Sequence, residues 1–185
     1  MPSTREVLLT AATRLIDEGG AGAVTLREVG RLAGVSHNAP YKHFAHKEAL
    51  LAAVAARELE VYANLLEPQD GRSATLEGAL EDYLDRAMRH PERFRLVYQR
   101  WTVVSDELGA AAAHATTALD ALIAVGQREG RIPGDSPARP ADLLRALTHG
   151  AIELTLTGHL GKRGDGRTPR DLVADLLELM GPSRT

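Results

Sequence analysis

The chain has 185 residues, 44% of them apolar, so it is long and apolar enough to bury a core, and its net charge of −3 excludes a histone-like binder of bulk nucleic acid. It contains no cysteine, which excludes disulfide frameworks, thiolate zinc sites and cysteine nucleophiles. Aromatic residues make up only 4%, and β-branched residues form no alternating run, so the sequence predicts an all-α fold.

The first predicted helix covers residues 3–18. Ser3 and Glu6 fit a capping box, in which a hydroxyl and a carboxylate three residues apart satisfy free N–H groups at a helix start. Apolar residues then recur at helical spacing until a glycine-rich run begins at Gly19. The glycines are expected to end the helix there.

Two short helices are predicted next, with a turn between them. Thr25 and Glu28 form a second capping box, and their helix ends at Gly34, which supplies the positive φ of a tight turn. Ser36 is predicted to cap a third helix that runs to about Phe44. This pattern is typical of a helix-turn-helix that binds DNA. A structural corner of two helices in an enzyme is the open alternative.

Small and apolar side chains suit the steep crossing of these two helices. Gly30 and Ala33 leave room for the second helix to approach the first. The other residues expected to close this core or its turn are Leu26, Val29, Val35, Tyr41 and Phe44.

A long fourth helix is predicted from His46 to about Leu66, followed by a polar break. Thr168, Pro169 and Asp171 combine an N-cap, a first-turn proline and an acidic third position, a strong helix start. Five helices are predicted after the fourth, which brings the total to nine. They cover residues 74–89, 91–102, 105–130, 139–161 and 168–180.

The run TLREVGRLAGVSHNAPYKHF at 25–44, followed by KEAL at 47–50, resembles the signature of TetR/AcrR-type transcriptional repressors. The resemblance covers roughly residues 3–60, and the length and helix count also suit the family. It implies a helix-turn-helix DNA-binding domain at 1–46. It also implies that residues 47–185 form an all-helical domain that senses a ligand and dimerises.

Two residues depart from the family's usual pattern. Gly30 stands where the family usually has alanine, and Pro40 stands where an aliphatic residue is commoner. If Ser36 is the N-cap, Pro40 falls at the fourth helical position and removes one backbone hydrogen bond. The third helix is therefore expected to be short or distorted at its start. The HNAPYKHF form, and more loosely the region around His149, resembles a subgroup of the family.

The candidate DNA contacts divide into two groups. Hydroxyl, amide and basic groups near helix starts suit phosphate oxygens, and residues along the front of the third helix suit base edges. The phosphate candidates are Thr25, Ser36, Tyr41, His43 and Lys47, with Arg5 as a flanking contact. The base-reading candidates are His37, Asn38, Ala39 and Lys42, where His37 can equally contact the backbone.

Histidines also raise the question of metal binding. His37, His43 and His46 lie near one another in sequence, but their spacing crosses a helix end and no carboxylate stands in ligand register. No metal and no cofactor is therefore expected. No catalytic residue is expected either, because no nucleophile elbow, phosphate loop or paired catalytic carboxylate is evident.

The last two predicted helices carry apolar residues over more than one face, which favours a core that continues into a homodimer interface. The two stripes are Leu143, Leu144, Leu147, Ala151 and Leu154, and Leu172, Val173, Leu176, Leu177 and Met180. The middle helices are expected to enclose an effector pocket. Its candidate lining residues are Tyr62, Tyr83, Tyr98, Trp101 and His149.

The sequence therefore predicts a transcriptional repressor that a small molecule releases from a pseudo-palindromic operator. Two alternatives stay open: a helical dimerising adaptor, and an activator without small-molecule control. The N-terminus shows no signal-peptide pattern, and the longest uncharged run of the second half, Leu108 to Leu119, is shorter than the ~20 residues of a membrane span. A cytoplasmic protein without a membrane partner is expected.

Overall fold

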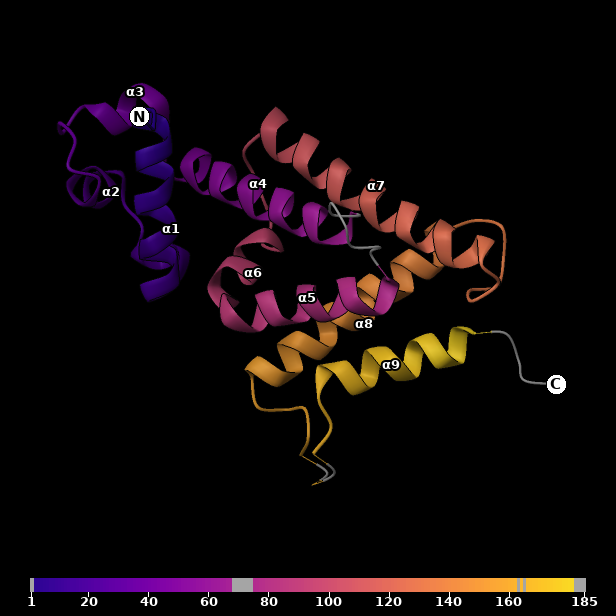
Figure 1. Ribbon diagram of the computed structural model, residues 1–185. Helices are drawn as coiled ribbons and strands as arrows, with labels where there is room; N and C mark the ends of the chain where they lie inside the picture. Colours follow the sequence, from indigo (N-terminus) through magenta and orange to yellow (C-terminus); the bar gives the residue numbers. More distant parts are fainter. Residues whose placement is uncertain (1, 68–74, 163, 165, 182–185) are drawn as a thin grey trace. The chain divides into compact units, whose positions relative to one another are not determined.

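The structure is a computed structural model that describes residues 2–67, 75–162, 164 and 166–181. Within these ranges it contains nine α-helices and no strand, which confirms the predicted all-α fold. The helices are α1 (Thr4–Ala23), α2 (Leu26–Leu32), α3 (Ala39–His43), α4 (Lys47–Leu66), α5 (Leu76–Arg89), α6 (Pro91–Val97), α7 (Asp106–Arg128), α8 (Ala138–Leu156) and α9 (Pro169–Met180) (Figure 1).

The chain folds into two compact units. The first unit comprises Met1–Val61 and His90–Ala113, and the second comprises Tyr62–Arg89 and His114–Thr185. Helices α4 and α7 each begin in the first unit and end in the second. The first unit therefore extends past residue 46, and the division into a DNA-binding domain at 1–46 and a sensing domain at 47–185 stays a prediction.

Three predicted caps are present. The Ser3 side chain accepts a hydrogen bond from the Glu6 N–H, and Thr25 does the same for Glu28. At α9 the capping box is complete, since Thr168 and Asp171 each accept the other's backbone N–H. These local signals fix three helix starts because each satisfies N–H groups that the helix itself leaves free.

Helix α1 continues past the predicted end at residue 18, but the glycines do interrupt it. Gly19 and Gly20 have non-helical backbone angles, and the chain resumes one turn that ends at Ala23. Gly20 has a φ of 67°, and a Cβ there would lie 2.7 Å from the Glu92 carboxylate of α6. The kink is therefore the place where α6 packs closely against α1.

Two predicted helix ends are wrong. Helix α6 stops at Val97 rather than near residue 102, and the N–H groups of Thr102 and Val103 bind the Glu48 carboxylate instead of helix carbonyls. Helix α8 stops at Leu156 rather than near 161, because Gly158 adopts a φ of 68°. The predicted start of a helix at 74 and the polar break before it lie outside the described residues.

The core of the first unit joins α1, α2 and α4, with Leu96 added from α6. Leu26, Val29 and Phe44 belong to this core as predicted. Polar contacts tie the same elements together at its surface: Arg93 donates to Asp17 at 2.7 Å, and Arg57 pairs with Glu6 at 3.1 Å. Helices α1, α4 and α6 are thus held as one body.

In the second unit, α5 packs against α8 and α9, and α8 lies beside α9 (Figure 1). The rings of Tyr62 and Tyr83 contact each other with centroids 4.5 Å apart. His114 on α7 lies 2.9 Å from the carboxylate of Glu67. These contacts join the end of α4 to α5 and α7.

Helix α7 is, in the described part of the chain, the one helix that is long and apolar enough to meet the length and composition of a membrane span. This is weak evidence for a membrane segment, because the core helix of a soluble protein meets the same criteria. Ala118, Leu119, Leu122 and Ile123 of α7 are buried inside the protein.

Candidate nucleic-acid interface

Helix α2 forms the scaffold half of the helix-turn-helix. Thr25 caps it with an oxygen that accepts from the Glu28 N–H at 3.1 Å, so the hydroxyl hydrogen is still available to donate. On its exposed side, Arg31 pairs with Glu28 at 2.6 Å. The hydrogen bond from Arg31 lowers the pKa of the Glu28 carboxyl, which keeps this side of the helix ionised and solvated.

The turn after α2 has the geometry that the sequence predicted. Gly34 has a φ of 66°, its N–H donates to the Arg31 carbonyl, and the Val35 N–H donates to the Gly30 carbonyl. This pair of bonds is a Schellman motif, which satisfies carbonyls at a helix end. The turn therefore directs the chain out of α2 in one fixed direction.

Helix α3 begins two residues later than predicted. Asn38, and not Ser36, occupies the N-cap position, and the helix covers only Ala39–His43. Pro40 consequently lies in the first helical turn. Backbone N–H groups there have no partner within the helix, so the absence of an N–H on proline costs no hydrogen bond. The prediction that this helix is short or distorted at its start is confirmed in its first form, since the helix has only five residues.

A single contact explains both departures from the family pattern. Pro40 is buried, and a Cβ built on Gly30 would lie only 2.8 Å from the Pro40 Cγ. The proline ring fills the space that an alanine side chain at position 30 would occupy. Gly30 and Pro40 are thus complementary, and together they set how closely α3 packs on α2.

The outer face of α3 is polar and exposed. His37, Asn38, Lys42 and His43 are all exposed, and Asn38 makes no side-chain capping bond, so its amide is not used by the helix. Tyr41 is 52% exposed, which makes the prediction that it closes the core wrong. Its ring lies 6.0 Å from the His37 ring on the surface. Tyr41 therefore belongs to the exposed face.

The other predicted contact residues surround this face. Ser36 is exposed in the turn, and Ala39 is half-buried at the start of α3. Lys47 is half-buried at the start of α4, with its Nζ 3.4 Å from the Gly22 carbonyl. The structure thus gathers all nine predicted DNA contacts on or beside the helix-turn-helix within the first unit.

Arg5, suggested as a flanking phosphate contact, also makes contacts within the first unit. Its guanidinium pairs with Glu107 at the start of α7 and lies 5.5 Å from the centre of the Phe44 ring. It therefore connects α1, the end of α3 and α7. No sequence signal joins these residues, because 102 positions separate Arg5 from Glu107.

Glu48 is a second connecting residue that sequence analysis missed. Its carboxylate accepts from the Thr102 hydroxyl at 2.7 Å, from the Thr102 N–H at 2.7 Å and from the Val103 N–H at 3.2 Å. These bonds, with the Thr102 hydroxyl foremost, lower the pKa of the Glu48 carboxyl. They fix the start of α4, immediately after Lys47, to the segment between α6 and α7.

The five predicted effector contacts divide between the two units. Tyr62, Tyr83 and His149 belong to the second unit, whereas Tyr98 and Trp101 belong to the first. Tyr98 is 41% exposed and contacts Phe94. The two groups of residues therefore belong to separate bodies.

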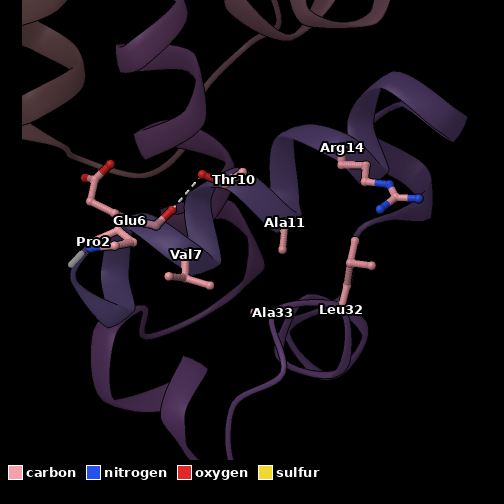
Figure 2. Close-up of a pocket in the computed structure, with 8 residues that line it drawn as sticks. All are labelled: Pro2, Glu6, Val7, Thr10, Ala11, Arg14, Leu32 and Ala33. Atoms are coloured by element: carbon pink, nitrogen blue, oxygen red, sulfur yellow. Dashed lines mark hydrogen bonds between the residues drawn. The ribbon is translucent and has the colours of Figure 1, made fainter.

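A pocket of about 320 Å³ opens between α1 and α2 in the first unit. Figure 2 shows its lining residues, among which Val7, Ala11 and Leu32 are apolar and Arg14 lies at one end. None of the predicted effector contacts lines it. In the part of the chain that the structure describes, no group of three or more metal-ligating side chains occurs.

The sequence matches two known family profiles. Residues 8–54 match the profile described as bacterial regulatory proteins of the tetR family. Residues 76–180 match the profile described as the tetracyclin repressor-like C-terminal domain. Together the two matches include the helix-turn-helix and most of the second unit. No curated protein sequence is similar enough to count as a match.

Solved structures share the fold over nearly the whole chain. A protein of unknown function from Rhodococcus sp. RHA1 superposes with a TM-score of 0.79 at 26% identity, covering 97% of this chain and 94% of its own. SmeT in complex with triclosan has a TM-score of 0.66 at 21% identity and 99% and 94% coverage. The fatty acid degradation regulator FadR from Bacillus halodurans has 0.66 at 17%, with 100% and 97% coverage.

Proposed function

Because the chain belongs to the tetR family of bacterial regulatory proteins and is a DNA-binding transcriptional regulator, we propose that it is a cytoplasmic repressor. A homodimer binds a pseudo-palindromic operator, and a small-molecule effector releases it. A regulator of this kind needs no cofactor and catalyses no reaction. The alternatives, an activator or a dimerising adaptor without an effector, are separated by the experiments below.

The exposed face of α3 is the observation that carries this proposal. Asn38 presents an unused amide, which can bind adenine through two hydrogen bonds, and Lys42 presents an ammonium suited to guanine. Ala39 can contact a thymine methyl. The polar groups around this face, on Thr25, Ser36, Tyr41, His43 and Lys47, suit phosphate oxygens.

The second unit supports the proposed homodimer. Leu143 and Leu154 on α8 are 48% and 46% exposed, and Leu179 on α9 is 83% exposed, although each lies on a helix that also buries an apolar face. A Cβ at Gly150 would meet nothing within 4 Å, so another helix can approach closely there. A four-helix interface from two copies of α8 and α9 would cover these side chains.

Dimerisation would allow the regulator to contact two successive major grooves of the DNA. Two recognition helices separated by one helical turn, roughly 34 Å, read two half-sites of a pseudo-palindrome. A single five-residue α3 offers few base contacts, so two copies are needed for useful operator affinity. The homodimer and the operator symmetry therefore belong to the same proposal.

Helix α4 provides a route from the effector to the DNA. It has 20 residues, a length of roughly 30 Å, and its start is fixed to the first unit through Glu48. Its end carries Tyr62, which contacts Tyr83 within the second unit. An effector that displaces this aromatic pair would tilt α4 together with the helix-turn-helix. A coupling of ~1–3 kcal/mol lowers operator occupancy several-fold to a hundred-fold.

The effector pocket is proposed for the second unit, with Tyr62, Tyr83 and His149 as its residues. SmeT was solved with triclosan, and FadR is described as a regulator of fatty acid degradation. Triclosan and fatty acids are both largely apolar molecules. We extend this to the present chain as a small, mostly apolar effector.

The DNA-binding claim is tested with the intergenic DNA upstream of the protein's own gene. Fluorescence anisotropy is recorded at several salt concentrations, with an unrelated duplex of equal length as the control. The proposal predicts tighter binding to the upstream DNA and a log affinity that falls linearly with log salt. An adaptor would show no salt-dependent binding to either duplex. Reporter transcription in the presence and absence of the protein then separates a repressor from an activator.

A further inference from the structure

Helix α8 presents an apolar face to the interior of the second unit. Leu144, Ala151 and Ile152 on this face are each no more than 2% exposed, and they recur at helical spacing. Thr148 occupies the middle of the same face and is only 3% exposed. A hydroxyl group is therefore placed among aliphatic side chains.

The Thr148 hydroxyl differs from the other buried or half-buried threonines on helices. Thr155, on the same helix, donates to the Ala151 carbonyl at 2.8 Å, and Thr13 on α1 donates to the Leu9 carbonyl at 2.9 Å. Among the residues that the structure describes, the buried Oγ1 of Thr148 has no hydrogen-bond partner. Burying a hydroxyl without a partner is unfavourable, and valine would fill the same space without that loss.

The surroundings of this hydroxyl define the chemistry that it can recognise. Between Ala141 and Ile152, the carboxylate and guanidinium of α8, on Asp142 and Arg145, are exposed and pair with each other, and His149 is the half-buried ionisable neighbour of Thr148. A charged group brought to Thr148 would find no carboxylate or guanidinium partner on the interior face of α8 and would lose its hydration. A neutral molecule with one hydrogen-bonding oxygen does not have this disadvantage.

We infer that Thr148 is an effector-binding residue, whose hydroxyl forms a hydrogen bond with the hydroxyl or carbonyl oxygen of a neutral, mostly apolar molecule. A threonine hydroxyl both donates and accepts, so either kind of oxygen is a suitable partner. The inference rests on the proposed effector-responsive function and adds the polar contact that fixes the orientation of the effector. The unused hydrogen bond of the free protein is formed in the complex.

The first test uses the free protein. Thr148→Val keeps the side-chain shape and removes the hydroxyl, and Thr155→Val is the matched control on the same helix. Because the Thr148 hydroxyl has no partner, T148V is expected to raise the Tm by about 2–4 °C, whereas T155V lowers it. A fall in the Tm of T148V would mean that the hydroxyl is bonded in the free protein, by a buried water or by the backbone, and would overturn the inference.

The second test uses pairs of compounds that differ by one oxygen: 1-naphthol with naphthalene, and 1-octanol with octane. Calorimetric titration of the wild-type protein is expected to show about three- to tenfold tighter binding of the oxygenated member. T148V should lose this preference, and T155V and T148S should keep it. Equal binding of both members, a preference that persists in T148V, or no binding of any compound would each overturn the inference.

The same variants are assayed for operator binding without compound. If the wild-type protein itself does not bind the upstream DNA, the proposed repressor function fails, whereas the compound preference still reports on Thr148. The two failures are therefore distinguishable.

Discussion

The contact between Gly30 and Pro40 predicts a strong energetic coupling within the helix-turn-helix. Replacing a mid-helix glycine with alanine normally stabilises a helix by about 1 kcal/mol. At position 30 the new Cβ would lie 2.8 Å from the Pro40 Cγ, and overpacking of this kind costs roughly 1–3 kcal/mol. Gly30→Ala alone is therefore expected to leave stability unchanged or to lower it by up to about 2 kcal/mol.

Removal of the proline ring reverses the sign of this effect. Pro40→Ala removes the ring atoms Cγ and Cδ. The next neighbour of a Cβ at position 30 is then the Val35 Cγ2, at 4.0 Å. There Gly30→Ala should stabilise the protein by about 1 kcal/mol. Gly109→Ala is the control, because a Cβ at Gly109 meets nothing within 4 Å and its effect should not depend on residue 40.

Urea denaturation of the four proteins in this cycle, at one fixed protein concentration, measures the coupling. The structure predicts a coupling energy of about 1–3 kcal/mol, the cost of the removed clash. Operator affinity should follow the same pattern, falling in Gly30→Ala and recovering in the double variant. Effects on stability that add within about 0.5 kcal/mol would show that the two residues do not set the packing of α3 on α2.

Two further predictions concern the contacts around α4 and the proposed dimer. Because the Thr102 and Val103 hydrogen bonds hold the pKa of Glu48 below its unfolded-state value, they stabilise the protein at neutral pH, and this contribution disappears as the pH falls through the folded-state pKa. Glu48→Gln should therefore lower the Tm at pH 7 and have a smaller effect at pH 3; a pH-independent difference would contradict this. Leu154→Glu should convert the dimer into a monomer in sedimentation velocity experiments, whereas Val104→Glu, at a 93% exposed position in the first unit, should not; a dimeric L154E protein would place the interface elsewhere.

Local signals in the sequence predicted the helices well. Capping residues at Ser3, Thr25 and Thr168 and the positive φ of Gly34 depend only on neighbouring backbone groups, so they can be recognised without tertiary information. The polar face of α3 was predicted for the same reason, and also through the family resemblance. The residues of this face come directly after the turn at Gly34 in the sequence.

Several of the errors have a common physical cause, which is contact between parts of the chain that are not adjacent in sequence. The start of α3 depends on how Pro40 packs against Gly30, and the N–H groups after α6 bind the carboxylate of Glu48 instead of helix carbonyls. Tyr41 was assigned to the core because aromatic residues are usually buried, although its ring is on the surface. Thr148 was missed because a threonine within an apolar helical stripe reads as a core residue.

The central claim is that α3 reads DNA through Asn38 and Lys42. The most direct test measures the affinity of the Asn38→Ala/Lys42→Ala double variant for the upstream intergenic DNA, with Lys162→Ala, an exposed lysine of the second unit, as the charge-matched control. Each lost base contact is worth about 1–3 kcal/mol, so the double variant should lose at least tenfold in affinity and most of its preference over unrelated DNA, and K162A should lose neither. Equal affinity and selectivity in the double variant and the wild-type protein would contradict the account.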